Sequence, residues 1–376
     1  MVIGGWRGVL SWVWCVLSTV SLAQENNGPP LSQPSSELTR EGATGAGEEQ
    51  TQKVAHLARV LKLEGQKHEI SRIFIFGDSL SDTSNIHKKS RGLFPPSPFY
   101  WRGRFADGPT WSEFVGESLG VEVHNFAEAG ARAQGLNHFY VLPPFLRHLW
   151  VQEVDSQFQK FIQGGFTLSS QDLVVVWIGG NDHLLFPGHD PLDQIVGRIK
   201  NLLTSLQDRG AQKIMVFNLP DVSVSPFHGL GVGRLLMRKH GIKKLIEEHN
   251  SMLHSLVETM RTKHPEVAYF EVDIYGVIAR LIRNASQYGF EDTKFPCLGR
   301  QLIPAPGVFR KFFDADALPW GVCSHPGRFF FWDPWHPSSK VHCLTAVHVV
   351  HQMGQESLLG AAGLAVDRDV AEKACL

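Results

Sequence analysis

The tetrapeptide Gly77-Asp78-Ser79-Leu80 stands directly after the apolar run of residues 73–76, and this junction constrains the chain more than any other feature. An apolar run followed by small polar residues is typical of a buried strand that ends in a turn before a helix. A helix N-terminus at this place would direct backbone N–H groups at an anion forming near the Ser79 hydroxyl. The alternative is an ordinary strand-to-helix turn in which Ser79 only caps the helix.

Three further segments also place polar residues or a glycine at the end of an apolar run. The apolar residues 172–178 lead to Asn181, whose amide can donate a hydrogen bond to an oxyanion, and Gly130 could expose a backbone N–H to the same site. Asp333 stands three residues before His336, and a carboxylate at this spacing can orient an imidazole and stabilise its protonated form. Each segment alone also fits a turn, a backbone requirement or a structural pair. Their common position at the ends of apolar runs favours a catalytic site.

Strand-like and helix-like segments alternate along most of the chain, without an internal repeat. After the strand before Ser79, we expect strands at 121–125, 173–178, 213–217 and 267–272, and helices at 110–119, 151–162, 192–206, 232–262, 273–283 and 338–352. This alternation predicts an α/β fold with a parallel sheet covered by helices on both faces. In such a fold the functional site lies at the carboxyl ends of the strands.

The chain resembles the GDSL-type esterases/lipases of the SGNH hydrolase superfamily over roughly residues 70 to 352. Besides the four segments above, residues 103–111 are similar to the family's Gly-Arg-Phe-Ser-Asn-Gly-x-x-Trp stretch, and residues 217–220 and 288–290 also have counterparts. Ala129 is a departure, because many relatives have consecutive glycines there. The resemblance implies a three-layer α/β/α sandwich with a central parallel sheet, of the SGNH hydrolase or flavodoxin-like type.

The resemblance also implies a role for each candidate site residue. Ser79 would be the nucleophile, His336 the general base and later the general acid, and Asp333 the group that orients His336. The oxyanion hole would consist of the backbone N–H groups of Ser79 and Gly130 and the side chain of Asn181. The reaction would be acyl transfer through a covalent acyl-enzyme. We expect no metal or other cofactor, since the chain has neither H-E-x-x-H nor a pair of Cys-x-x-Cys motifs.

Several other residues belong to the surroundings of this site. Asp78 and Asp82 flank the nucleophile, and we expect them to shape its loop rather than to titrate. His183 could lie at the rim, with a structural or solvent-facing role as the alternative. Residues 93–101 and 139–150 are rich in aromatic, leucine and proline side chains, so we expect both segments to border the cleft.

The substrate class stays open at this stage. An apolar rim suits the acyl chain of a lipid or phospholipid ester, whereas aromatic side chains also suit a carbohydrate acetyl ester. A lipid acyltransferase and a catalytically silent surface-binding protein are further alternatives, and the complete set of site residues argues against the silent protein. The net charge of −1 argues against nucleic-acid binding. Basic residues are denser at 234–244, which predicts either a solvated helix face or a patch for anionic lipid headgroups on a membrane surface.

The N-terminal residues indicate export. Arg7 precedes the apolar stretch 9–20, and small residues at 21–23 offer a cleavage site, so residues 1–23 are predicted to be a secretory signal peptide, with a signal anchor as the alternative. We predict a disordered low-complexity leader at 24–66 because it has almost no large apolar groups, apart from a short helix near 54–63. The hydrolase domain is placed at 67–356 and a C-terminal tail at 357–376. The protein is expected to be secreted or to lie in the lumen of the secretory pathway.

Cysteine usage agrees with export, because four cysteines remain beyond the predicted signal peptide. Cys297 and Cys323 flank a loop just before the segment that carries the expected base, and we predict a disulfide between them that stabilises the fold by about 2–4 kcal/mol. Cys343 could be a buried thiol or could pair with Cys375. Asn284 begins an Asn-Ala-Ser acceptor for N-glycosylation.

Overall fold

The computed structural model describes residues 36–61, 68–133, 153–184, 190–229, 239–298, 321–359 and 367–376. The chain divides into two compact units, Met1–Gly45 and Ala46–Leu376. All the elements given below belong to the second unit, apart from the first turns of one helix. The predicted signal peptide at 1–23 lies outside the described residues.

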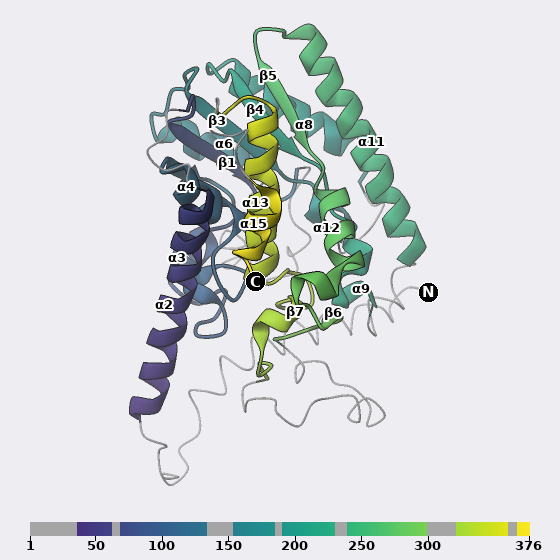
Figure 1. Cartoon of the computed structure of the whole chain (residues 1–376). Helices are drawn as coiled ribbons and strands as arrows, with labels where there is room; N and C mark the ends of the chain where they lie inside the picture. Colours follow the sequence, from purple (N-terminus) through teal and green to yellow (C-terminus); the bar gives the residue numbers. More distant parts are fainter. Residues whose placement is uncertain are drawn as a thin grey trace. The chain divides into compact units, whose positions relative to one another are not determined.

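A parallel sheet of five strands forms the centre of the second unit (Figure 1). Its strands are Arg72–Gly77 (β1), Glu122–Asn125 (β2), Asp172–Trp177 (β3), Lys213–Phe217 (β4) and Ala268–Val272 (β5). The spatial order is β2-β1-β3-β4-β5, so the direction of the connections reverses between β1 and β3. Ligands of doubly wound folds bind at this switch point, outside the carboxyl ends of the strands. The strands expected from the sequence are all present, and β4 has the expected bounds.

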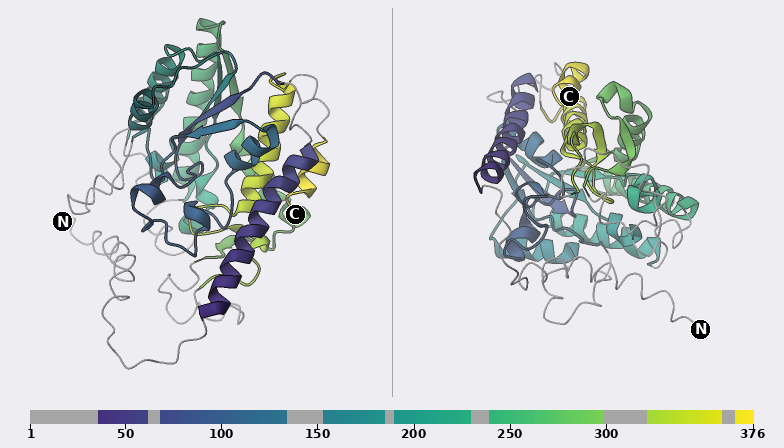
Figure 2. Two further views of the ribbon diagram at one scale, coloured as in Figure 1. Left: turned by 90° about the vertical axis from the view of Figure 1, so that its left-hand side faces the viewer. Right: turned by 90° about the horizontal axis from the view of Figure 1, so that it is seen from below.

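Helices cover both faces of the sheet, as the α/β/α prediction requires (Figure 2). Side chains of β1 alternate between two cores, with Ile73 and Ile75 on one side and Phe74 and Phe76 on the other, all fully buried. The first core also takes in α4 (Trp111–Leu119), α12 (Ile274–Arg283), α13 (Ser339–Gln355) and α15 (Arg368–Lys373). The second core takes in α6 (Val154–Gln163), α8 (Leu192–Gln207) and much of α11 (Lys239–Lys263). Burial on both faces explains the continuous apolar runs that predicted the strands.

A second, two-stranded parallel sheet stands apart from the central one. It pairs β6 (Asp292–Pro296) with β7 (Phe329–Phe331). The shorter elements are α3 (Asn85–Lys89), α7 (Gly180–Leu184), α9 (Pro226–Gly229) and the 3-10 helices η1 (Trp101–Gly103), η3 (Val222–Val224), η4 (Ala285–Tyr288) and η6 (Pro326–Arg328). The segment that carries Asp333 and His336 therefore follows β7 of this small sheet and not a strand of the main sheet. No helix within the described ranges is long and apolar enough to cross a bilayer.

The structure differs from the expected leader at its C-terminal part. Helix α2 covers Ser36–Leu61, where we expected disorder and only a short helix near its end. Leu57, Ala58 and Leu61 are buried, and the two leucines belong to the first core. Their helical spacing gives the otherwise polar segment one apolar stripe that packs on the domain, and this packing stabilises a longer helix than composition alone indicates. The domain boundaries themselves stay a prediction.

Two disulfides are present within the second unit. Cys297 pairs with Cys323, with their Cα atoms 4.9 Å apart. Cys343 pairs with Cys375, which joins α13 to α15, so the pairing that the sequence left open exists in the structure. All four cysteines are buried. Cys343 and Cys375 belong to the first core, and Cys297 and Cys323 belong to a small cluster beside β7.

Replacing both Cys343 and Cys375 by alanine should lower the free energy of unfolding by about 2–4 kcal/mol, because the unfolded chain then loses a cross-link. Urea denaturation measures this change. Catalytic activity at room temperature should be retained, since neither sulfur lies at the site described below. An unchanged unfolding midpoint would contradict the structural importance of this bond.

Candidate active site

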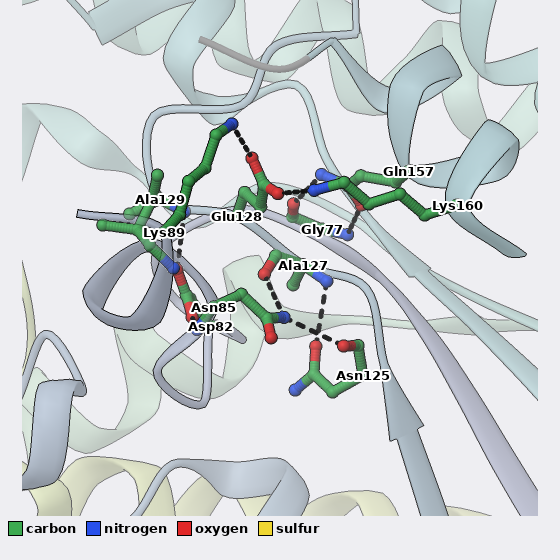
Figure 3. Close-up of polar contacts among 11 residues, drawn as sticks. Gly77, Asp82, Asn85, Lys89, Asn125, Ala127, Glu128, Ala129, Gln157 and Lys160 are labelled. Atoms are coloured by element: carbon green, nitrogen blue, oxygen red, sulfur yellow. Dashed lines mark hydrogen bonds and ion pairs between the residues drawn. The ribbon is translucent and has the colours of Figure 1, made fainter. Parts of the chain in front are cut away.

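The turn after β1 begins at a position that only glycine can occupy. A Cβ added to Gly77 would lie 2.7 Å from the backbone carbonyl oxygen of Trp177 on the neighbouring strand β3. The buried side chain of Gln157, on α6, then holds Gly77 from both sides (Figure 3). Gln157 Oε1 accepts the Gly77 N–H at 2.9 Å, and its Nε2 donates to the Gly77 carbonyl at 2.6 Å. Ser79, two residues further on, therefore starts from a fixed backbone.

The chain turns immediately at the serine. The N–H groups of Ser81 and Asp82 both donate to the Asp78 carbonyl, at 3.0 and 2.9 Å. The helix that we expected directly after Ser79 begins only at Asn85, the first residue of α3. The N-cap residue of this helix is Ser84, and the carboxylate of Asp82, not the hydroxyl of Ser79, accepts the Asn85 N–H at 2.6 Å. The reading of Ser79 as a simple helix cap is therefore wrong.

The structure brings Ser79, His336 and Asp333 into one hydrogen-bonded chain. His336 Nε2 lies 2.8 Å from Ser79 Oγ, and His336 Nδ1 lies 2.7 Å from Asp333 Oδ2. The other carboxylate oxygen, Asp333 Oδ1, accepts the backbone N–H groups of Trp335 and His336, both at 2.7 Å. A carboxylate with one oxygen held by the backbone and the other on the imidazole is suited to fix the tautomer of that imidazole.

The loop that carries Asp333 and His336 is closed on itself. The Trp332 N–H donates to the His336 carbonyl at 2.8 Å, and the Phe227 N–H donates to the Pro334 carbonyl at 3.0 Å. The ring of Trp335 stacks on Phe227, with centroids 3.5 Å apart. These contacts tie the loop to β7 on one side and to α9 on the other, so its geometry exists before any substrate binds.

Asp333 is a buried carboxylate that is nevertheless held in its charged form. Burial alone would raise its pKa, but the charge and the hydrogen bond of His336, the backbone donors and Tyr100 together hold the pKa of Asp333 below its usual range. The Tyr100 hydroxyl donates to Asp333 Oδ2 at 2.7 Å. We expected Tyr100 only as part of an aromatic rim, so this contact is one that sequence reasoning missed.

The loop after β2 is fastened to the nucleophile turn by side chains (Figure 3). The Ala129 N–H donates to Asp82 Oδ2 at 2.9 Å, which makes Asp82 a bridge between the two segments. The carboxylate of Glu128 is buried, and it forms ion pairs with Lys89 on α3, at 3.0 Å, and with Lys160 on α6. The position of this loop relative to Ser79 therefore depends on the Asp82 bridge and on the ion pairs of Glu128 with lysines of two helices.

Gly130 follows directly in this loop and has a φ of 80°. Glycine is favoured in this left-handed region, and Ala129 does not adopt it, so the departure at Ala129 leaves the required conformation at Gly130. The Asn181 side chain donates to the Ala131 carbonyl at 2.9 Å, which connects the turn after β3 to the same loop. Asn181 lines the cavity at Ser79, whereas Gly130 is not among the residues that line it.

The cavity that opens at Ser79, Asn181 and His336 has a largely apolar lining. Its walls come from η3, α12, β7 and α13, with the apolar side chains of Val222, Val224, Ile278, Phe330, Phe331 and Val341. No group of three or more His, Cys, Asp or Glu side chains within the described ranges is placed to hold a metal ion.

Residues 93–101, which we expected to border the cleft, are not among those that line the cavity at Ser79. His183 is fully buried and its Nε2 lies 3.2 Å from His249 Nδ1, so the rim position is wrong and the structural alternative is correct. Burial lowers the pKa of His183 to about 4. Residues 139–150 lie outside the described residues, as does most of the basic segment 234–244.

Comparisons with known proteins show the family of this chain. The GDSL-like lipase/acylhydrolase family model matches residues 73–349, so the chain belongs to this family. The phosphatidylcholine-sterol acyltransferase of Aeromonas hydrophila is 29% identical over 259 residues, which are 68% of this chain and 73% of that protein. The secreted effector protein SseJ of Salmonella typhimurium is 28% identical over 74% of this chain and only 62% of its own length. GDSL esterase/lipase 6 of Arabidopsis thaliana is 24% identical over 73% and 84% of the two chains. The family and these relatives support an ester-hydrolase or acyl-transferase activity.

One solved structure can be placed beside these relatives. A family two carbohydrate esterase from Clostridium thermocellum, solved in complex with cellohexaose, covers 77% of this chain and 65% of its own. The TM-score is 0.38 at 13% identity, and a likeness this weak supports no argument about the substrate.

Asp78 and Asp82 hydrogen-bond within the loop as expected, but burial also brings their titration close to neutral pH. Burial raises the pKa of Asp78 to about 6, against the opposing effects of the Leu80 N–H and of His336. Burial likewise raises the pKa of Asp82 to about 6, although three backbone N–H groups donate to its carboxylate. Both groups shape the loop, and their raised pKa values also make their ionisation sensitive to pH near 6.

Asp78→Asn should stabilise the protein at about pH 7, by about 1–3 kcal/mol, because one pKa unit corresponds to about 1.4 kcal/mol. Native Asp78 holds its proton more tightly than the unfolded chain does, so wild-type stability falls as the pH rises from about 4 to about 6. Asparagine stays neutral and can still accept the Leu80 N–H. Urea denaturation across this pH range tests the sign. A variant that is less stable than the wild type at neutral pH would contradict the argument.

Proposed function

We propose that this chain is a secreted serine ester hydrolase that cleaves carboxylic esters, with acyl esters of lipids or phospholipids as its substrates. The observation that carries the proposal is the hydrogen-bonded chain from Ser79 Oγ through His336 to Asp333, with distances of 2.8 and 2.7 Å. Ser79 and His336 line a cavity. This arrangement has the geometry that nucleophilic acyl transfer requires.

In the proposed mechanism, His336 Nε2 takes the proton of Ser79 as Oγ attacks the ester carbonyl carbon. The oxyanion that forms is stabilised by the N–H groups of Ser79 and Gly130 and by the amide of Asn181. His336 then gives its proton to the departing alcohol, which leaves an acyl group on Ser79. His336 next removes a proton from water, the resulting hydroxyl attacks the acyl-enzyme, and the carboxylic acid is released as Ser79 regains its proton. Asp333 remains ionised throughout.

The apolar lining supports a lipid substrate over a sugar ester. A polysaccharide acetyl ester presents hydroxyl groups that need polar partners, whereas the walls from η3, α12, β7 and α13 offer mainly aliphatic and aromatic side chains. The relative from Aeromonas hydrophila, named a phosphatidylcholine-sterol acyltransferase, points to the same substrate class. If an acceptor alcohol took the place of water in the second step, the same site would transfer the acyl group instead of hydrolysing it.

Two features support a place in the secretory pathway. The disulfides Cys297–Cys323 and Cys343–Cys375 are of the kind that persists in oxidising compartments. Asn284 stands at the end of α12 and is partly exposed, so its Asn-Ala-Ser sequence is open to N-glycosylation there. Contact with a lipid surface, through which a lipid ester would reach the cavity, is part of the same proposal.

Ser79→Ala should abolish hydrolysis of p-nitrophenyl esters, with a fall of about 10³-fold or more, while the thermal unfolding midpoint stays close to that of the wild type. Ser255→Ala, at an exposed site on α11, is the control and should keep full activity. A fluorophosphonate should label Ser79, located by mass mapping. Label on a different serine, or activity that survives Ser79→Ala, would remove the proposed mechanism.

The length of the acyl chain tests the lipid preference. Esters from butyrate to palmitate should be hydrolysed better than acetate, because a longer chain buries more apolar surface in the cavity. Val222→Phe, which narrows the cavity, should reduce activity toward long chains by about tenfold and toward acetate much less. Val370→Phe, at an exposed position on α15, is the matched control. A steep fall beyond acetate in the wild type would favour a carbohydrate deacetylase instead.

A further inference from the structure

Tyr100 places a phenol hydroxyl against the carboxylate that holds His336. The hydroxyl donates to Asp333 Oδ2 at 2.7 Å, the same oxygen that lies 2.7 Å from His336 Nδ1. Burial, followed by the charge of Asp333, raises the pKa of Tyr100 well above its usual range. The phenol therefore keeps its proton and acts as the donor in this bond.

The contact is not needed to orient the carboxylate. Asp333 Oδ1 already accepts two backbone N–H groups, from Trp335 and His336, which fix the plane of the carboxyl group. What Tyr100 adds is a second donor on Oδ2, the oxygen that faces the imidazole. A hydrogen bond to an ionised oxygen is strong and stabilises its charge, so Oδ2 is less able to draw the proton away from Nδ1.

The ring of Tyr100 is held rigidly. It packs edge-on against Trp332, with centroids 6.5 Å apart, and lies 5.8 Å from the ring of Phe105. Phe105 in turn lies 5.0 Å from the ring of His336. Tyr100 and Trp332 also belong to the small apolar cluster around the disulfide of the 297–323 segment. The packing of Phe105 and Trp332 on the Tyr100 ring therefore holds the hydroxyl against Asp333.

We propose that Tyr100 is a positioning residue of the catalytic site, whose hydroxyl keeps Asp333 Oδ2 a charged acceptor and sets the pH range in which His336 can take the Ser79 proton. The proposal rests on the proposed function and adds a fourth side chain to it. Without the phenol, Asp333 Oδ2 loses one of its hydrogen-bond donors. Its negative charge is then less stabilised and attracts the protonated imidazole of His336 more strongly. The protonated form of His336, which cannot act as a base, is then stabilised more strongly. Asp78 and His342 also interact with the charge of His336, and both are unchanged in a variant of Tyr100.

The test compares Tyr100→Phe with Tyr275→Phe. Tyr275, on α12, donates its hydroxyl to Glu247 at 2.9 Å, so this control also removes a tyrosine–carboxylate hydrogen bond but leaves the active site untouched. The first readout is the rate at which a fluorophosphonate labels Ser79, measured from acidic to alkaline pH. The second is kcat and KM for p-nitrophenyl butyrate, with thermal unfolding in parallel.

For Tyr100→Phe we expect the acid limb of the labelling profile to move to higher pH by about half a unit or more. We also expect kcat to fall about 3–10-fold with little change in KM, since the substrate contacts are kept. Tyr275→Phe should match the wild type in both. The nitrogen-bound proton between His336 and Asp333, seen at low field by NMR, should shift in Tyr100→Phe only.

Two outcomes would overturn the proposal alone. One is that the fluorophosphonate labels Ser79 of the wild type and of Tyr100→Phe with the same dependence on pH. The other is a fall in activity that follows a loss of stability, with the acid limb unmoved, because that result assigns Tyr100 to packing. A wild type that is not labelled at Ser79 at any pH would overturn the proposed function, and this inference with it.

Discussion

The close parallel pairing of β1 and β3 is the constraint on which the site depends. It brings the Trp177 carbonyl so near to Gly77 that no side chain fits there, and the turn with Ser79 must start from that glycine. The amide of Gln157 satisfies both backbone groups of Gly77 in a buried place, where an unpaired group costs about 1–3 kcal/mol. A different turn would leave those groups unpaired, so the backbone has one favoured path and Ser79 has one favoured position.

The groups of the site come from two sheets. Ser79 and Asn181 follow strands on either side of the switch point of the main sheet, whereas Asp333 and His336 follow β7 of the small sheet. The small sheet is held by the disulfide of the 297–323 segment and by backbone bonds that close the loop on itself. The alignment of nucleophile and base therefore depends on contacts between the main sheet and the segment after β7, and Tyr100 makes one of these contacts through its hydrogen bond to Asp333.

The sequence predicted the central sheet well, because strands buried on both faces have continuous apolar runs, and Lys213–Phe217 was found with its observed bounds. It could not predict the contact of Tyr100 with Asp333, since 233 positions separate the two residues and no local periodicity records such a pair. The rim position of His183 was wrong for a related reason. A helix of five residues is too short to show which face it buries, and the contact that His183 makes with His249 of α11 is distant in sequence.

The buried carboxylates around the nucleophile differ in the groups that donate hydrogen bonds to them. This difference decides whether the pKa of each carboxylate is raised or lowered. Asp78 and Asp82 are bonded only by backbone N–H groups, and burial raises the pKa of each to about 6. Asp333 has backbone donors together with His336 and Tyr100, which overcome burial and hold its pKa below the usual range. In mildly acidic solution Asp78 and Asp82 are therefore partly neutral, whereas Asp333, which faces the imidazole, keeps its charge. Where the other two carboxylates stay neutral, they do not oppose the oxyanion that forms during attack.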